Sequence, residues 1–155
     1  MNSLTSAVGA VITDEAGRVL LCQQRHGHRL WGLPGGKIRT DEDPIHAAIR
    51  DIREETGCET EIVDLVGLYR LTGDGCGDDL PDVLTYVFRG RLSASDVAVN
   101  SPRIARLSWH APDDLPEPMT ATTRHALAHA TEGRSGVVCA VERDKEPEIP
   151  EAVSV

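Results

Sequence analysis

Aromatic residues are scarce in this chain, which contains two Trp, two Tyr and one Phe among 155 residues. Proteins that bind single-stranded nucleic acid along their surface stack successive bases on aromatic side chains, so this scarcity excludes such a platform. Positive charge is also in short supply, because 16 Lys and Arg residues stand against 25 Asp and Glu residues, for a net charge of -9. That field repels large nucleic acids and anionic membranes. A small phosphorylated ligand can still bind if a cation bridges it to the acids.

Cysteine is rare and scattered, and no two of the four cysteines form a C-x-x-C pair. The sequence therefore supports neither a zinc knuckle nor a dithiol redox motif. The N-terminal segment lacks the basic start and apolar stretch of a signal peptide, and no apolar run reaches the roughly 20 residues that cross a bilayer. We expect a reduced, cytoplasmic protein without a membrane partner. Its cysteines are Cys22, Cys58, Cys76 and Cys139.

The length of 155 residues predicts a single domain with one sizeable core. β-Rich runs separated by Gly- and Pro-containing turns are mixed with two helical segments, which indicates an α/β or α+β sandwich. The first two runs flank the turn DEAG and are expected to pair as a hairpin, and residues 26–38 are expected to form a loop. The predicted strands are 7–13, 18–25, 61–73, 83–92, 104–111 and 136–141, and the second helix covers 118–131.

The C-terminal segment 142–155, ERDKEPEIPEAVSV, is rich in Pro and acids and has few large apolar side chains. Such a composition buries too little apolar surface to fold on its own. We therefore predict one domain over residues 1–141, followed by a disordered acidic tail. The sequence leaves open whether the chain forms a homodimer.

The segment RDIREETG at residues 50–57 places three carboxylates close together on one predicted helix. Asp43 is a suitable N-cap, Pro44 suits the first helical position, and Gly57 suits the residue that ends the helix. At about 100° per residue, the acids fall about 120° from an apolar arc that should face the core. The acids are Asp51, Glu54 and Glu55, the arc contains Ile45, Ala48, Ile49, Ile52 and Thr56, and Ala47 should leave room for a ligand beside the acids.

This acidic face has two interpretations. Like charges three and four residues apart on a helix repel, and Arg50, four residues before Glu54, offsets only part of that repulsion. A solvated acidic face is the simpler interpretation of a run such as Arg-Glu-Glu. The alternative is a divalent-cation site, because hard cations such as Mg²⁺ bind clustered oxygen ligands and keep water and substrate phosphates in their remaining positions.

The residues before the helix favour the cation site. From Gly36, five residues lead to Glu42 and seven more lead to Arg50, where RDIREETGC begins. The stretch 36–58 closely resembles the Nudix box, whose pattern is Gly, five residues, Glu, seven residues, then Arg-Glu-aliphatic-any-Glu-Glu-any-Gly-aliphatic. The preceding WGLPGG (31–36) matches what usually leads into the box. The resemblance implies a Nudix-like α/β/α sandwich, with a mixed sheet and the box helix packed on one side.

Nudix enzymes hydrolyse a nucleoside diphosphate linked to another group, and their box binds divalent cations. The resemblance therefore implies a hydrolase that depends on Mg²⁺ or Mn²⁺, because such a cation neutralises the diphosphate and acidifies the attacking water. It implies that Arg50 orients a box carboxylate, most of all Glu54, and that Glu42 steadies the loop. The metal ligands it implies are the backbone carbonyl of Gly36 and the side chains of Asp51, Glu54 and Glu55. The catalytic residues it implies are these three acids together with Arg50.

The resemblance covers about residues 4–132 and has two departures. Cys58 replaces the usual aliphatic residue, which is a mild change because buried Cys behaves as a small hydrophobe. Asp51 replaces the usual Glu and is one methylene shorter. We therefore expect a weakened or water-mediated metal contact at Asp51, with Glu54 and Glu55 carrying most of the affinity.

The general base is implied to be either a box carboxylate or an acid on a distant loop. Relatives often carry Glu just before the residue that corresponds to Trp109, but here the segment NSPRIARLSWH (100–110) has no acid. The Gly-rich loop at 73–82 offers other acids, for which a solvated turn is the alternative interpretation. These acids are Asp74, Asp78, Asp79 and Asp82.

Several other side chains are weaker candidates. Arg25 ends a predicted strand and is either a substrate-binding residue that meets a phosphate or an ordinary surface residue. Trp109 either stacks on a base or packs in the core. His125 and His129 lie four apart on a predicted helix, a spacing that can bind zinc, but no Glu follows His125 as in HExxH, so we expect them at the surface.

The expected partner is a small nucleotide-like diphosphate, and the sequence leaves its identity open. A nucleoside triphosphate, a sugar nucleotide and a modified nucleotide are all compatible with the box. The alternative function is a Nudix-fold module that binds a nucleotide without hydrolysing it. Such modules usually lose several box acids, whereas every acidic box position is acidic here, which favours the enzyme.

Overall fold

The computed structural model describes residues 4–73, 80–94 and 97–144. Within these ranges the chain alternates strands with two helices, α1 (Pro44–Thr56) and α2 (Ala121–Thr131). The strands are β1 (Leu4–Ile12), β2 (Val19–Gln24), β3 (Trp31–Gly32), β4 (Gly35–Lys37), β5 (Thr60–Thr72), β6 (Asp82–Leu92), β7 (Ile104–His110) and β8 (Val137–Glu142).

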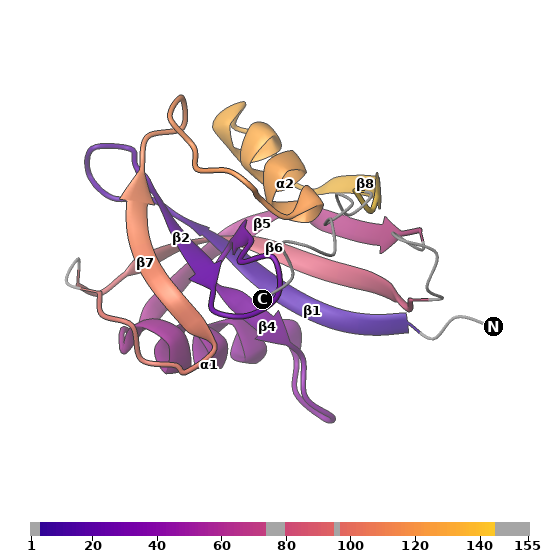
Figure 1. Ribbon diagram of the computed structural model, residues 1–155, viewed down its shortest axis with the longest axis horizontal. Coiled ribbons are helices and arrows are strands. Elements are labelled where there is room, and N and C mark those ends of the chain that lie inside the picture. Colours follow the sequence, from indigo (N-terminus) through magenta and orange to yellow (C-terminus); the bar gives the residue numbers. More distant parts are fainter. Residues whose placement is uncertain (1–3, 74–79, 95–96, 145–155) are drawn as a thin grey trace, which may run out of the picture.

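The strands form two sheets, ordered β4-β1-β6-β5-β8 and β3-β2-β7. In the larger sheet β1 runs parallel to β6 and β5 runs parallel to β8, whereas the other neighbours are antiparallel. Helices α1 and α2 lie on opposite sides of this sheet (Figure 1), and each packs against it through its own apolar cluster. This α/β/α arrangement with a mixed sheet confirms the predicted fold class.

Strand β1 contributes side chains to the apolar clusters under both helices, because successive side chains of a strand point to opposite faces. Val8 packs with Ala47 and Phe88 on the α1 side, whereas Val11 belongs to the cluster beneath α2. Ala47 is fully buried, so the prediction that it leaves room for a ligand is wrong. Its short side chain instead allows α1 to lie close to the sheet.

The buried face of α1 contains two of the predicted acids. Asp51 and Glu55 are buried together with Ala48 and Ile52, whereas Ile45, which was expected in the core, is 47% exposed. The helical period separates polar from apolar side chains, but it does not show how far the helix is rotated when it docks. The interface between α1 and the rest of the domain therefore encloses two carboxylates.

The predicted hairpin between the first two strands does not form beyond its turn. Gly17 donates to the carbonyl of Asp14 at 3.0 Å and closes the turn, but only an isolated bridge joins Thr13 to Val19. Both edges of β1 are occupied by β4 and β6, so β2 pairs with β3 and β7 in the second sheet. The prediction of a loop over 26–38 is also wrong in part, because that segment contains β3 and β4.

The ends of α1 agree with the sequence prediction. The carboxylate of Asp43 accepts a hydrogen bond from the His46 amide at 2.9 Å, and Pro44 occupies the first turn. Gly57 adopts a left-handed conformation with a φ of 75°, and its amide donates to the carbonyl of Arg53. These bonds satisfy backbone groups that a helix end leaves unpaired, so the limits of the box helix are set by local sequence.

The C-terminal end of the described chain is bound to the sheet. Strand β8 ends at Glu142 and pairs in parallel with β5. The amide of Arg143 donates to the carbonyl of Thr72 at 2.8 Å, and its guanidinium donates to the carbonyl of Pro81 at 2.5 Å. The start of the predicted tail therefore contacts the domain, and its remainder, 145–155, lies outside the described residues.

We expect removal of residues 142–155 to lower the melting temperature relative to removal of 145–155. The longer truncation loses the end of β8 and the bonds of Arg143, and intramolecular hydrogen bonds contribute about 1 kcal/mol each. For a domain of this size the loss corresponds to roughly 5 °C. Thermal unfolding of both truncated chains by circular dichroism measures the difference, and equal melting temperatures would show that Arg143 contributes nothing to stability.

Candidate active site

A cavity of about 590 Å³ opens beside α1. Its walls come from β2, the β3–β4 segment, α1 and the residues that enter β7. The structure brings five of the predicted site residues together in this lining, whereas Glu42 and Arg25 are not part of it. The five are Gly36, Arg50, Asp51, Glu54 and Glu55.

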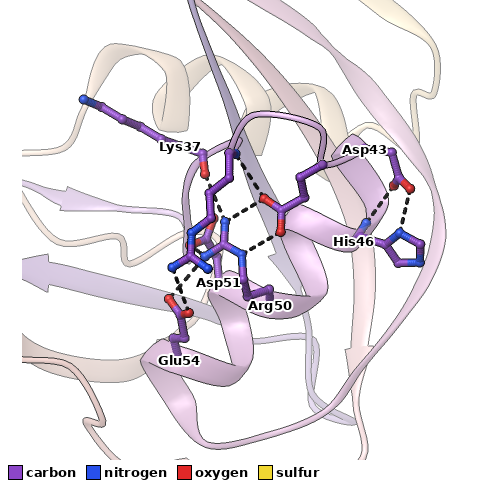
Figure 2. Close-up of polar contacts among 8 residues, drawn as sticks. Lys37, Asp43, His46, Arg50, Asp51 and Glu54 are labelled. Atoms are coloured by element: carbon purple, nitrogen blue, oxygen red, sulfur yellow. Dashed lines mark hydrogen bonds and ion pairs between the residues drawn. The ribbon is translucent and has the colours of Figure 1, made fainter.

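Arg50 connects the loop before α1 to the acids on the helix (Figure 2). Its Nε and Nη2 atoms donate to the two oxygens of Glu42 at 2.6 and 2.8 Å. Its Nη1 atom donates to Oδ1 of Asp51 at 3.0 Å and to Oε2 of Glu54 at 3.2 Å. The sequence predicted Glu54 as the main partner of Arg50. The structure instead shows the bidentate pair, which is the stronger kind of contact, between Arg50 and Glu42.

Glu42 is held in its charged form by this pairing. The hydrogen bonds from Arg50 lower the pKa of Glu42 to about 2, and the amide of Arg39 donates to the same carboxylate at 3.1 Å. In return, the Glu42 carboxylate raises the pKa of Arg50. A permanently charged pair of this kind links the loop to the helix, which is the geometry that a structural role for Glu42 requires.

Asp51 lies at the bottom of the cavity and is 2% exposed. Its Oδ1 atom accepts from Arg50, whereas its Oδ2 atom is buried and has no hydrogen-bond partner within the described part of the chain. Gly36 lies directly above it, because a Cβ at that position would be 3.1 Å from both carboxylate oxygens. Burial raises the pKa of Asp51, against the opposing charge of Arg50. A buried polar atom without a partner is unusual and requires an explanation.

Glu55 is also buried, with 5% of its surface exposed. Its Oε1 atom accepts from the amide of Gly35 at 2.8 Å, and its Oε2 atom accepts a weak bond from the thiol of Cys22 at 3.6 Å. Burial raises the pKa of Glu55 to about 7, the Gly35 amide opposes that rise, and the charge of Asp51 adds to it. The carboxylate therefore lies between its charged and neutral forms near neutral pH.

Glu54 lies at the mouth of the cavity, with 41% of its side chain exposed, and pairs with Arg39 at 3.3 Å. Within the described residues no three acidic, His or Cys side chains converge tightly enough to form a ready-made metal site. The donors nevertheless suit a hard cation, because they are oxygens, Asp51 has an unpaired one, and Gly36 has no side chain to obstruct it. The site therefore fits Mg²⁺ or Mn²⁺ by its chemistry.

A model of the NUDIX domain matches residues 3–130. This chain belongs to the Nudix family. A MutT-like protein of Streptomyces ambofaciens is 33% identical over 127 residues, which cover 82% of this chain and 77% of the relative. A putative 8-oxo-dGTP diphosphatase of Bacillus subtilis is 28% identical over 112 residues, which cover 72% and 70%. The crystal structure of a MutT NUDIX hydrolase from Burkholderia pseudomallei has a TM-score of 0.74 at 31% identity, covering 83% of this chain and 98% of that one.

The protein is thus a Nudix hydrolase, an enzyme that acts on phosphoric anhydride bonds. The family assignment confirms the resemblance predicted from residues 36–58. Over the ranges that the structure describes, no helix has the length and apolar character needed to cross a membrane.

Arg25 of this Nudix hydrolase points its guanidinium at backbone carbonyls. Its Nε atom donates to the carbonyl of Pro102 at 3.1 Å and its Nη2 atom to that of Ile104 at 3.3 Å. The sequence left open whether this side chain meets a phosphate or is an ordinary surface residue, and these bonds direct it to the segment before β7. Arg103, in the same segment, lines the cavity instead.

The remaining candidates that the structure describes are not part of the cavity lining. His129 bonds to the hydroxyl of Tyr69 at 2.9 Å, and His125 is exposed as expected. Trp109 packs beside the cluster beneath α1 that contains Ile52. Asp82 pairs with Arg70 at 2.8 Å, and the other three acids of that loop, Asp74, Asp78 and Asp79, lie outside the described residues.

Three residues of the site escaped sequence reasoning. Cys22 looked like one more apolar residue of a strand, and Gly35 like part of a turn. No local pattern predicts that both contact Glu55, because the contacts join β2, β4 and α1. Arg103 left a weak signal, since it is a basic residue in the segment 100–110, which contains no acid.

Without divalent cations, the Nudix hydrolase should become more stable as the pH falls from about 7 toward 4.5. Burial raises the pKa of Glu55 to about 7 from its usual 4.5, so in this window the folded state binds a proton that the unfolded chain lacks. A shift of this size corresponds to about 3 kcal/mol. Urea unfolding in EDTA at pH 5 and 7.5 measures the gain.

The Glu55→Gln variant should lose most of this pH dependence, because its side chain cannot titrate. Glu59→Gln is the matched control, since Glu59 is exposed and pairs with Arg53, and it should keep the dependence. Equal pH profiles for the parent protein and Glu55→Gln would contradict the assignment to Glu55.

Proposed function

We propose that this Nudix hydrolase depends on a divalent cation and hydrolyses a nucleoside diphosphate derivative, with water attacking a phosphorus of the diphosphate. The observation that carries the proposal is the buried Oδ2 atom of Asp51, which has no partner in the described part of the structure and lies beside Gly36. Leaving a buried carboxylate oxygen unpaired costs free energy. A cation at this position would remove that cost.

The protein groups around this position are held by other residues of the chain. Arg50 shares its Nη1 atom between Asp51 and Glu54, and the Gly35 amide holds Oε1 of Glu55. When bound, a cation of this kind neutralises substrate phosphates and acidifies the attacking water. The groups that would hold Mg²⁺ or Mn²⁺ are the carbonyl of Gly36 and the side chains of Asp51, Glu54 and Glu55.

The proton of the attacking water is accepted, in this proposal, by a carboxylate of the cavity itself. A general base must come within hydrogen-bond reach of its water. Asp51, Glu54 and Glu55 are the carboxylates of the described lining, and the segment before Trp109 has no acid to supply. The base is therefore drawn from the box.

Asp51 takes a larger part in this proposal than its short side chain predicted. The carboxylate lies close to Gly36, so the shorter side chain matches the close approach of α1 to β4. A longer acid would have to displace β4 or leave its rotamer, and overpacking of this kind is destabilising. We therefore infer a full ligand role for Asp51, and expect Asp51→Glu to be less active than the parent.

The substrate is proposed to be a small nucleotide carrying several phosphates. The lining includes Lys37, Arg39 and Arg103 near the acids, which suits a polyanion bound through a cation. The names of the relatives, MutT-like protein and putative 8-oxo-dGTP diphosphatase, support testing nucleoside triphosphates first, including oxidised ones. The proposed setting of the reaction is the cytoplasm.

We expect Asp51→Asn, Glu54→Gln and Glu55→Gln each to lower kcat by about 100-fold or more. Each change removes a negative charge that would hold the cation, and such losses typically cost this much. Phosphate or pyrophosphate release at several Mg²⁺ concentrations measures kcat and the apparent metal affinity. Glu59→Gln serves as the control and should behave like the parent. Near-normal turnover in all three variants would refute the metal site.

The proposed function itself is tested by a panel of nucleoside triphosphates, sugar nucleotides and dinucleotides, with products identified by chromatography. The expected result is turnover that requires Mg²⁺ or Mn²⁺ and stops in EDTA. Nucleotide binding without turnover of any compound would favour the binding-module alternative.

A further inference from the structure

The segment before β7 forms one wall of the cavity and places a positively charged arginine side chain there. Arg103 and Ile104 both line the cavity that holds the box acids. The side chain of Arg103 is exposed and makes no hydrogen bond or ion pair with any other residue in the described ranges. Its guanidinium is therefore available to a ligand.

The other cations near the box acids are differently placed. Arg50 is occupied by Glu42, Asp51 and Glu54. Figure 2 shows the ammonium group of Lys37 extended away from this network. Arg103, by contrast, lines the same cavity as the two buried acids, Asp51 and Glu55, from the segment before β7. Arg103 thus faces the box across the cavity.

The backbone that carries Arg103 is held by Arg25. The amide of Arg25 donates to the carbonyl of Arg103 at 2.9 Å. Its guanidinium donates to the carbonyls on either side, those of Pro102 and Ile104, at 3.1 and 3.3 Å. One residue therefore binds three consecutive carbonyls, and Arg103 projects from the middle of this clamp.

We propose that Arg103 is a substrate-binding residue that contacts a phosphate of the nucleotide, and that Arg25 is a positioning residue that holds it in place. This inference rests on the proposed function. A guanidinium offers a planar fork of donors that matches phosphate oxygens. Holding its backbone in advance reduces the ordering cost of binding. The segment 100–110, which contains no acid, thus supplies a guanidinium for the substrate.

The first test is steady-state kinetics of Arg103→Gln with the best nucleotide of the panel at saturating Mg²⁺. KM should rise about 10-fold or more, as loss of a charge-assisted hydrogen bond predicts, and kcat should change less than about 3-fold. Arg103→Lys keeps the charge without the fork and should recover part of the loss. Arg106→Gln is the matched control, because Arg106 is exposed on β7 outside the lining.

A double-mutant cycle tests the role of Arg25. Arg25→Gln should raise KM in the parent but have little further effect in the Arg103→Gln background, because its effect passes through Arg103. Arg25→Lys should not restore KM, since one ammonium group cannot replace a fork that reaches two carbonyls. If Arg25→Gln raises KM equally in both backgrounds, Arg25 has a purely structural role, and the proposal that it positions Arg103 is overturned.

Binding of pyrophosphate, measured by calorimetry in Mg²⁺, separates failure of this inference from failure of the proposed function. If the panel shows no turnover but Arg103→Gln weakens pyrophosphate binding about 10-fold, the contact between Arg103 and a phosphate is supported and the proposed hydrolysis is rejected. If the parent turns over nucleotides and Arg103→Gln changes neither KM nor pyrophosphate binding, the inference is overturned. The inference is also overturned if the parent does not bind pyrophosphate and Arg103→Gln leaves KM unchanged.

Discussion

The close contact between α1 and β4 is the constraint on which the rest of this site depends. Gly35 has a φ of 148° and lies so near β1 that a Cβ there would be 2.0 Å from the carbonyl of Val8. Gly36 presents an equally bare surface to the carboxylate of Asp51. Gly35 therefore lets β4 lie against β1, and Gly36 lets the acid-bearing helix α1 lie close to β4. The acids are consequently buried where burial is unfavourable, and apolar packing beneath Ala47 and elsewhere in the core must offset the cost.

Environment, more than residue type, sets the chemistry of the box carboxylates. Glu42 and Glu55 begin with the same ordinary pKa, yet the fork of Arg50 lowers the first to about 2 and burial raises the second to about 7. Glu42 therefore stays charged, and Glu55 titrates near neutrality, although the two side chains are chemically identical. Arg50 contacts both Glu42 and the cavity, so the loop and the helix keep one relative position.

Local features of this protein could be predicted from the sequence, and features set by docking could not. Asp43 and Gly57 mark the ends of α1 through bonds to residues three or four positions away, and the spacing of the box is likewise local. The rotation that buries Asp51 and exposes Ile45 depends on how α1 meets β1 and β4, which no helical period encodes. The failed hairpin has the same origin, since distant β6 occupies the edge of β1. The direction of the Arg25 side chain also depends on β7, far along the chain.

The parallel pairing of β1 with β6 has a consequence for how the site is assembled. Leu4 pairs with Asp82, so more than half of the chain must be synthesised before β1 gains this neighbour. Contacts between such distant segments form slowly, because loop closure precedes them. Strand β4 rests on the opposite edge of β1, and it cannot be stably seated until that strand is in place. During synthesis Asp51 and Glu55 therefore spend an interval in water as ordinary carboxylates, and burial raises their pKa values only after β6 arrives.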